Sequence, residues 1–343
     1  MAQDTPPAEM RRWQIAAPGA FIKNLSLVTA PTPAASALKS DQVLVRVVAA
    51  GVNPADYKVP EFGLVTRAAL PYPCTPGMDY SGRAVAVGSA VADVQPGDAV
   101  FGRVDFATVQ GTLSEYVVAG PESVAVIPGA ADADLLERAG AVGTAGLTAY
   151  QCIAPYVKAG DEVFINGGSG GCGTFGVQIA KAIGCRVTVS CSTAKAELCR
   201  SLGADDVVDY RTADVVAALR ARGRVFALVV DNVGNSPANL YKAADDFLLP
   251  EGRYKFVGGN LSLALVPGLL LPGFLGGAKH KFETFVTKNS RQDLTRMAAW
   301  MAEGKLRTVV DSTFEFEDVV KAYEKLKEGS STGKIVVRVA RKA

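Results

Sequence analysis

The feature that most constrains the fold is a glycine-rich turn between a short apolar strand and a helix. Residues 168–173 read Gly-Ser-Gly-Gly-Cys-Gly, which fits the pattern G-x-G-x-x-G, and they follow the apolar run 163–165. The chain then continues with segments typical of helix, strand, helix and strand, at residues 176–184, 186–191, 196–203 and 227–234. Strands that alternate with helices predict a parallel, doubly wound sheet in an α/β protein.

The same turn predicts a dinucleotide site. Glycines let the backbone approach a pyrophosphate, whose charge is then met by the N–H groups at the start of the following helix. A glycine-rich surface turn is the alternative, but the strand before the motif and the helix after it favour the binding site. The residues predicted to line this site are Gly168, Ser169, Gly170, Gly171, Cys172 and Gly173.

The residues after the next strand favour a cofactor with a 2′-phosphate. Sites that prefer NAD place an acid there to bind the ribose 2′-hydroxyl, whereas this chain has Ser192, Thr193 and Lys195. Hydroxyl donors and an ammonium suit a phosphate. We therefore expect NADPH, with Tyr210 closing the same pocket; the alternative for Lys195 is a solvated helix residue.

Composition and charge limit which partners, metal sites and cellular locations are expected. Lys and Arg number 36 against 34 Asp and Glu, a net charge of +2, which implies no field strong enough to hold nucleic acid. The six cysteines include no C-x-x-C pair, so spacing indicates neither a disulfide framework nor a zinc cage. The polar start of the chain lacks the apolar stretch of a secretory signal, and a cytoplasmic location is expected.

The segments 162–184, 201–210 and 228–234 resemble the coenzyme domain of the medium-chain dehydrogenase/reductase superfamily. The segments 49–58, 76–82, 94–102, 111–117, 146–153 and 331–337 are similar to its quinone oxidoreductase branch, particularly the enone and alkenal reductases. The resemblance covers nearly the whole chain. It implies a GroES-like, mostly β catalytic domain at 1–145, a Rossmann coenzyme domain at 146–288, and a return segment at 289–343 that completes the first domain.

The resemblance also implies chemistry without a metal. Zinc alcohol dehydrogenases of this superfamily have a cysteine where this chain has Asn53, and a His-Glu pair where it has Met78 and Asp79. The chain's one histidine, His280, stands far from these positions in the sequence. Without a Lewis acid, hydride delivery to a carbon made electrophilic by conjugation remains easy. The expected acceptors are an enone, an enal, an enoyl thioester or a quinone.

Three residues of one loop are the candidates for catalysis, and each has a structural alternative. Asn53 is predicted to bind a ribose hydroxyl or a substrate oxygen, or else to brace the turn before Pro54. Lys58 is predicted to orient the cofactor and stabilise an oxyanion, or to be solvated. Tyr57 is a candidate proton donor or a packed aromatic.

Further positions are assigned by the resemblance or by local pattern. Asp56 and Asp79 are expected to accept backbone N–H bonds, and neither has an obvious basic partner in the sequence. Lys334 is expected either to reach the cofactor or to be a surface charge beside an edge strand. The remaining predicted cofactor contacts are Thr148 and Val233.

The most apolar stretch, residues 261–277, contains Pro267 and Pro272 and falls short of a bilayer span. We expect a lid over an apolar substrate, with a dimer contact or a peripheral membrane contact as alternatives. The leading hypothesis is an NADPH-dependent enone or quinone reductase. The alternatives are a trans-acting enoyl reductase on polyketide or acyl thioesters and a non-catalytic NADPH-binding protein. A homodimer is expected from the resemblance, with a monomer as the alternative.

Overall fold

The computed structural model describes residues 5–105, 109–258 and 280–340. Contacts between Cα atoms divide the chain into two compact units, Met1–Leu147 with Asn289–Ala343, and Thr148–Lys288. The sequence-based boundaries were 145/146 and 288/289. No helix in the described parts of the chain is both long and apolar enough to cross a membrane. The predicted lid at 261–277 lies outside the described residues.

The unit Thr148–Lys288 is built on a parallel sheet. Its strands lie in the order β10-β9-β8-β11-β12-β13, and every neighbouring pair is parallel. In chain order this is 3-2-1-4-5-6, the arrangement of dinucleotide-binding folds. The strands are β8 (Glu162–Asn166), β9 (Arg186–Cys191), β10 (Asp206–Asp209), β11 (Phe226–Asp231), β12 (Leu248–Phe256) and β13 (Phe282–Thr284).

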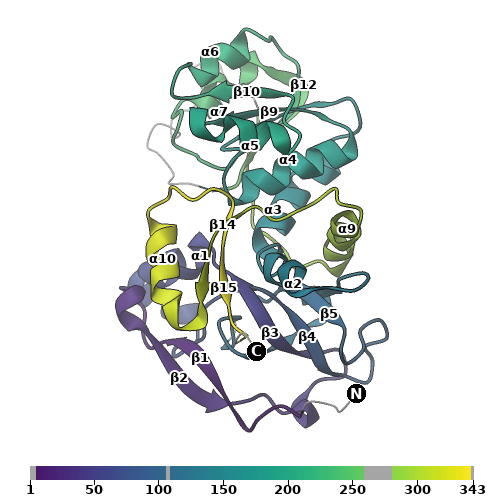
Figure 1. Cartoon of the computed structure of the whole chain (residues 1–343). Helices are drawn as coiled ribbons and strands as arrows, with labels where there is room; N and C mark the ends of the chain where they lie inside the picture. Colours follow the sequence, from purple (N-terminus) through teal and green to yellow (C-terminus); the bar gives the residue numbers. More distant parts are fainter. Residues whose placement is uncertain (1–4, 106–108, 259–279, 341–343) are drawn as a thin grey trace. The chain divides into compact units, whose positions relative to one another are not determined.

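Helices connect these strands. The strands are rich in apolar residues, which are buried on both faces of the sheet. Val163, Phe164 and Ile165 in β8 are all fully buried, as a continuous apolar run in a covered parallel strand should be. Helix α4 is buried along Gly173–Ala180 and ends at Gly184, which has a φ of +98°. The helices are α4 (Gly171–Ile183), α5 (Ala196–Ser201), α6 (Val215–Arg220) and α7 (Leu240–Ala243), visible in Figure 1.

The other unit is built mainly on an antiparallel sheet whose path runs β14-β15-β3-β4-β5-β7, with β6 also paired to β3. The C-terminal strand β15 pairs with β3 on one side and β14 on the other, so the return segment completes this sheet (Figure 1). The strands are β3 (Val43–Gly51), β4 (Asp79–Val87), β5 (Ala99–Arg103), β6 (Tyr116–Ala119), β7 (Val124–Val126), β14 (Val310–Glu315) and β15 (Lys334–Arg338).

The helices of this unit pack on its sheet and complete its core. Helix α10 contributes the fully buried Tyr323, whose ring lies edge-on to Phe21 at a centroid distance of 4.7 Å. The return segment contributes two helices, α9 and α10, before its last strand. The helices are α1 (Pro54–Glu61), α2 (Ala133–Ala139), α9 (Arg291–Ala302) and α10 (Val319–Lys327), while α3 (Gly143–Ile153) connects the two units.

The sequence analysis did not identify the N-terminal hairpin. Strands β1 (Glu9–Ile15) and β2 (Leu25–Pro31) pair antiparallel over their whole length. Trp13 in β1 is buried and donates its indole N–H to the carbonyl of Phe316 at 2.8 Å. The charged residues in this strand obscure the alternation that usually reveals a β-strand.

Candidate functional site

The glycine turn after β8 is held tightly against the strands beside it. The N–H of Gly168 bonds to the carbonyl of Ser190 at 2.9 Å, and the N–H of Gly167 bonds to the Ser190 hydroxyl at 2.9 Å. A Cβ on Gly173 would lie 2.1 Å from the carbonyl oxygen of Gly167, which explains why this position requires glycine. A Cβ on Gly170 would meet only that same oxygen, at 3.6 Å. The middle of the turn is therefore open to a ligand.

The turn fits the pyrophosphate of a dinucleotide. Gly170 is the N-cap of α4, and the first N–H groups of any helix have no acceptor within the helix. These donors, together with the positive end of the helix dipole, favour an anion. The residues predicted from sequence, 168–173, thus run from the turn into the first turn of α4, where an anion would fit. Their contact with a cofactor remains a prediction. The turn's place after the first strand of a 3-2-1-4-5-6 sheet fits a nicotinamide dinucleotide.

A buried polar cluster that the sequence analysis missed supports the ends of β8 and β11. Asp231 is only 1% exposed. Its Oδ1 accepts from the side chain of Asn166 at 2.8 Å and from the N–H groups of Val233 and Gly234. Its other oxygen accepts from the hydroxyl of Tyr254 at 2.6 Å. These bonds fix the backbone at Val233, a predicted cofactor contact. An acid directly after the apolar run 228–230 was the available signal.

The predicted 2′-phosphate loop, with Ser192, Thr193 and Lys195, follows β9. An acid that was not predicted from the sequence, Asp209, lies beside this loop. Thr193 donates its hydroxyl to Asp209 at 2.5 Å, and the N–H of Arg211 bonds to the same carboxylate. The Thr193 hydroxyl and this N–H keep the pKa of Asp209 below its usual range. The guanidinium of Arg211 lies 5.6 Å from the ring centre of Tyr210, which is 48% exposed. The loop therefore carries charges of both signs.

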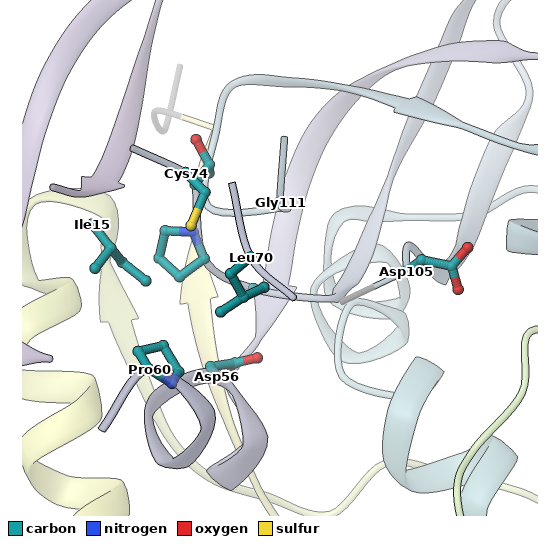
Figure 2. A pocket seen from close by; sticks show the side chains of 10 residues that line it. Ile15, Asp56, Pro60, Leu70, Cys74, Asp105 and Gly111 are labelled. Carbon is teal, nitrogen blue, oxygen red and sulfur yellow. The ribbon is translucent and has the colours of Figure 1, made fainter. Parts of the chain in front are cut away.

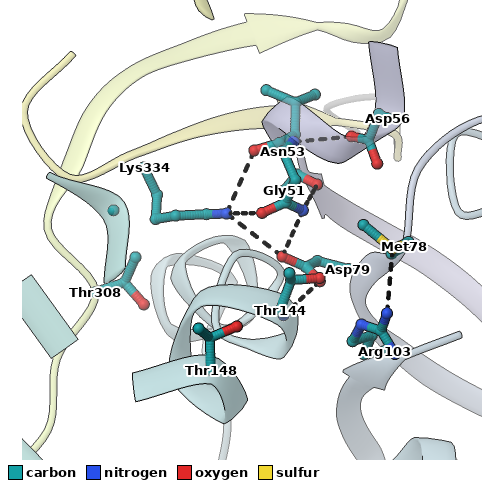
Figure 3. A network of polar contacts seen from close by, with 12 residues as sticks. Gly51, Asn53, Asp56, Met78, Asp79, Arg103, Thr144, Thr148, Thr308 and Lys334 are labelled. Carbon is teal, nitrogen blue, oxygen red and sulfur yellow. Dashed lines mark hydrogen bonds and ion pairs between the residues drawn. The ribbon is translucent and has the colours of Figure 1, made fainter. Parts of the chain in front are cut away.

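In the first unit, Asn53 lies at the centre of a buried network (Figure 3). Its Oδ1 accepts from Nζ of Lys334 at 2.6 Å, and its Nδ2 donates to Oδ2 of Asp79 at 2.9 Å. The side chain is 4% exposed. A contact with a ribose or a substrate therefore has to share or replace these bonds, and the predicted binding role of Asn53 remains a prediction.

Lys334 and Asp79 form a buried ion pair. The Lys334 ammonium lies 3.4 Å from Oδ2 of Asp79 and donates to the carbonyl of Val52 at 3.3 Å. The other Asp79 oxygen accepts from the N–H and the hydroxyl of Thr144 at 2.6 and 2.5 Å (Figure 3). The basic partner of Asp79, which was not obvious in the sequence, is Lys334, brought to it by β15 from the end of the chain. The surface-charge alternative for Lys334 is wrong, because the residue is 4% exposed and β15 is not an edge strand.

Asp56 is a second buried acid beside this network. Its Oδ2 accepts from the N–H of Asn53 at 2.8 Å and from the hydroxyl of Tyr323 at 3.1 Å. Burial, opposed by these hydrogen bonds and reinforced by the charge of Asp79, raises the pKa of Asp56 to about 7. The expected backbone bond is present, but no pattern in the sequence indicates that the pKa of this carboxyl is raised.

The remaining predicted residues differ in exposure. Lys58 is exposed in the last turn of α1. Tyr57 is partly buried against the core, the Lys327 ammonium lies 4.9 Å from its ring centre, and burial raises its pKa. Thr148 and Thr287 both belong to the second unit, and their hydroxyl groups share a hydrogen bond of 2.5 Å. The roles assigned to these residues remain predictions.

The positions that resemblance aligns with zinc ligands make other contacts here. Asn53 and Asp79 bind Lys334, and the sulfur of Met78 accepts from Arg103 at 3.4 Å. Within residues 5–105, 109–258 and 280–340, no three His, Cys, Asp or Glu side chains are grouped so that they could hold a metal ion.

The parallel sheet with its glycine turn and the separate β domain with its polar network define a two-domain oxidoreductase of the nicotinamide-binding class. Residues 39–129 match the family described as alcohol dehydrogenase GroES-like domain, and residues 202–337 match the family described as zinc-binding dehydrogenase. The chain belongs to the medium-chain dehydrogenase/reductase superfamily.

The chain is also similar to individual proteins of known name over most of its length. The chain is 47% identical to a trans-enoyl reductase, pgmF, of Aspergillus terreus, with 98% of both chains covered. It is 30% identical to the 2-methylene-furan-3-one reductase of Solanum lycopersicum, over 96% of this chain and 79% of the relative. Among solved structures, the quinone oxidoreductase of Coxiella burnetii superposes with a TM-score of 0.80 at 28% identity, covering 97% of this chain and all of that one.

Proposed function

We propose that this protein is an NADPH-dependent reductase that delivers hydride to a carbon–carbon double bond conjugated to a carbonyl group. The leading substrate class is an enoyl thioester presented in trans by another protein. The observation that carries the proposal is the similarity to a trans-enoyl reductase across 98% of both chains. A quinone acceptor is the second candidate, supported by the likeness to the quinone oxidoreductase structure.

The preference for NADPH rests on the loop after β9. Ser192, Thr193 and Lys195 stand where NAD-preferring sites place an acid. Asp209 lies beside Thr193, but the Thr193 hydroxyl and the Arg211 N–H already bond to its carboxylate. The Thr193 O–H is used by Asp209, so the Ser192 hydroxyl is the donor that remains in this loop. That hydroxyl, with a lysine and an arginine nearby, favours a ribose 2′-phosphate over a 2′-hydroxyl.

The cofactor supplies the hydride, and the chain's task is to bind, orient and stabilise charge. The N–H groups at the start of α4 would hold the pyrophosphate, and Asp231 fixes the strand ends beside the turn. Hydride addition to a conjugated double bond places negative charge on the carbonyl oxygen. Hydrogen-bond donors in the first unit would stabilise that charge, and Lys58 is the exposed candidate.

The test compares NADPH with NADH oxidation by the purified protein, using an enoyl thioester, a cyclic enone, an aliphatic enal and a quinone. Lys195→Ala is expected to lower kcat/KM with NADPH about tenfold or more, and to leave the value with NADH unchanged, because only NADPH carries the 2′-phosphate. Lys242→Ala serves as the matched control, since Lys242 is an exposed lysine of the same unit.

The outcome assigns the substrate class. Faster reduction of the enoyl thioester than of the quinone supports the leading class, and the reverse order supports the second. Binding of NADPH without turnover of any of the four acceptors would contradict the proposed activity.

A further inference from the structure

A cavity in the first unit lies directly beside Asp56 (Figure 2). The cavity is small and partly open to solvent. Apolar groups of Ile15, Pro60, Leu70 and Cys74 form much of its wall, and all four residues are buried. Burial raises the pKa of the Cys74 thiol to about 11, so this sulfur stays protonated and uncharged near neutral pH.

Two polar atoms on this wall are buried without a partner. Oδ1 of Asp56 and Oγ1 of Thr75 have no hydrogen-bond partner among the residues that the structure describes. Both residues line the cavity and are at least 95% buried, with exposed fractions of 1% and 4%. A buried polar atom without a hydrogen-bond partner raises the free energy of the folded protein. Binding of a group that enters the cavity and forms hydrogen bonds with both atoms would therefore be favoured.

The surroundings of Asp56 decide which of its oxygens carries the proton. Oδ2 already accepts from Asn53 and Tyr323, so the proton of the neutral acid belongs on Oδ1, the atom without a partner. Burial raises the pKa of Asp56 to about 7; the charge of Asp79 acts in the same direction, and that of Lys334 acts against it.

Two other titratable groups near Asp56, Tyr323 and Cys74, keep their protons near neutral pH. Burial raises the pKa of Tyr323 well above its usual range, so its hydroxyl remains a donor to Asp56. Of the other ionisable residues that line the cavity, Cys74 stays neutral and Asp105 is exposed. Neutral Asp56 therefore presents an O–H group to the cavity, as Thr75 does. An acid kept neutral by an apolar site can donate a hydrogen bond to an oxygen.

We propose that Asp56 and Thr75 form a two-donor subsite for a carbonyl oxygen of the substrate, with Ile15, Leu70 and Cys74 as its apolar wall. The subsite rests on the proposed function, because an enone or enoyl thioester supplies the carbonyl group. A carbonyl oxygen only accepts hydrogen bonds, and it can accept one from each hydroxyl. The same two donors would stabilise the negative charge that develops on this oxygen as hydride is added.

The test uses two probes with the protein and NADP⁺ or NADPH. The saturated hexanoyl thioester of N-acetylcysteamine cannot accept hydride, so calorimetry with it measures binding alone. The trans-2-hexenoyl thioester measures reduction. Thr75→Val removes the hydroxyl at nearly constant volume, and Thr75→Ser retains it. Thr32→Val is the control, because Oγ1 of Thr32 is also buried without a partner and does not line the cavity.

The proposed subsite predicts how each variant and the pH should change binding of the saturated probe. Thr75→Val should weaken binding of the saturated probe about tenfold, whereas Thr75→Ser and Thr32→Val should stay within about twofold of the parent protein. Binding by the parent protein should weaken as the pH rises through about 7, because Asp56 then loses the proton that it donates. Asp56→Asn should remove this pH dependence.

The two probes separate failure of the subsite from failure of the proposed function. Reduction of the enoyl probe with no effect of Thr75→Val or Asp56→Asn on either probe overturns the subsite and leaves the proposed function standing. Binding of the saturated probe with the predicted pattern, but no reduction, supports the subsite and contradicts the proposed activity. Failure of the parent protein to bind the saturated probe at pH 6 also overturns the subsite.

Discussion

Nζ of Lys334 lies 2.6 Å from Oδ1 of Asn53, although 281 positions separate the two residues in the chain. The pairing of β15 with β3 produces this contact, because Val336 lies opposite Gly51 in the sheet. The N–H of Val52 also bonds to the carbonyl of Ile335 at 3.2 Å. The predicted loop with Tyr57 and Lys58 is in fact helix α1, whose N-cap is Asn53. The start of this helix is thus fixed by the last strand of the protein.

Lys334→Met should destabilise the protein by about 3–5 kcal/mol, because it leaves the buried carboxylate of Asp79 without its cation. The free energy of unfolding in urea measures the effect. Adding Asp79→Asn to this variant should recover part of the loss, since no uncompensated charge is then buried. Lys305→Met removes an exposed pair with Glu303 and should cost no more than about 1 kcal/mol. Equal losses in the two lysine variants would show that the buried pair is not required.

Two glycines of the same turn should respond differently to alanine. Gly173→Ala would place its Cβ 2.1 Å from the Gly167 carbonyl oxygen, so we expect a loss of stability of about 1–3 kcal/mol. Gly170→Ala has room for its Cβ in the free protein and should keep its Tm, but it should weaken NADPH binding because the methyl group faces the open turn. Thermal unfolding and cofactor titration measure the two effects. Unchanged NADPH affinity in a folded Gly170→Ala protein would argue against pyrophosphate binding there.

Asp56 should make stability depend on pH. Its pKa is about 7 in the folded state, against an ordinary value of 3.8, so the folded protein holds an extra proton between these limits. Its contribution to the free energy of unfolding is fully present below about pH 4, falls by about 1.4 kcal/mol per pH unit above that, and is lost above about pH 7. Comparison of the parent protein with Asp56→Asn across pH 4–8 isolates this contribution. A constant difference between the two proteins would mean that Asp56 does not titrate in this range.

Asp209→Asn should increase the affinity for NADPH a few-fold, because it removes a negative charge that lies beside Thr193 in the predicted phosphate loop. The amide oxygen can accept from the Arg211 N–H while the amide NH2 donates to the Thr193 hydroxyl oxygen, so the loop should keep its shape. NADH is the internal control, since it lacks the 2′-phosphate, and its affinity should change little. Equal gains for NADPH and NADH would place the 2′-phosphate away from Thr193.

The sequence by itself determined the coenzyme fold. A strand such as 163–165 is identified by its continuous apolar run, and Gly173 is required by local sterics at the start of a helix. These signals are short-range, so they can be identified without knowing the rest of the structure. The α/β class, the parallel sheet and the glycine turn at the start of α4 were therefore predictable.

Only the tertiary structure decided how the polar residues combine. The partnership of Lys334 with Asn53 and Asp79 depends on the pairing of β15 with β3, and the raised pKa of Asp56 depends on its burial beside Tyr323. Asp231 and Tyr254 likewise meet through neighbouring strands of the other sheet. Hydrogen bonding and desolvation act over a few ångströms of space, and sequence separation does not reveal which groups come that close.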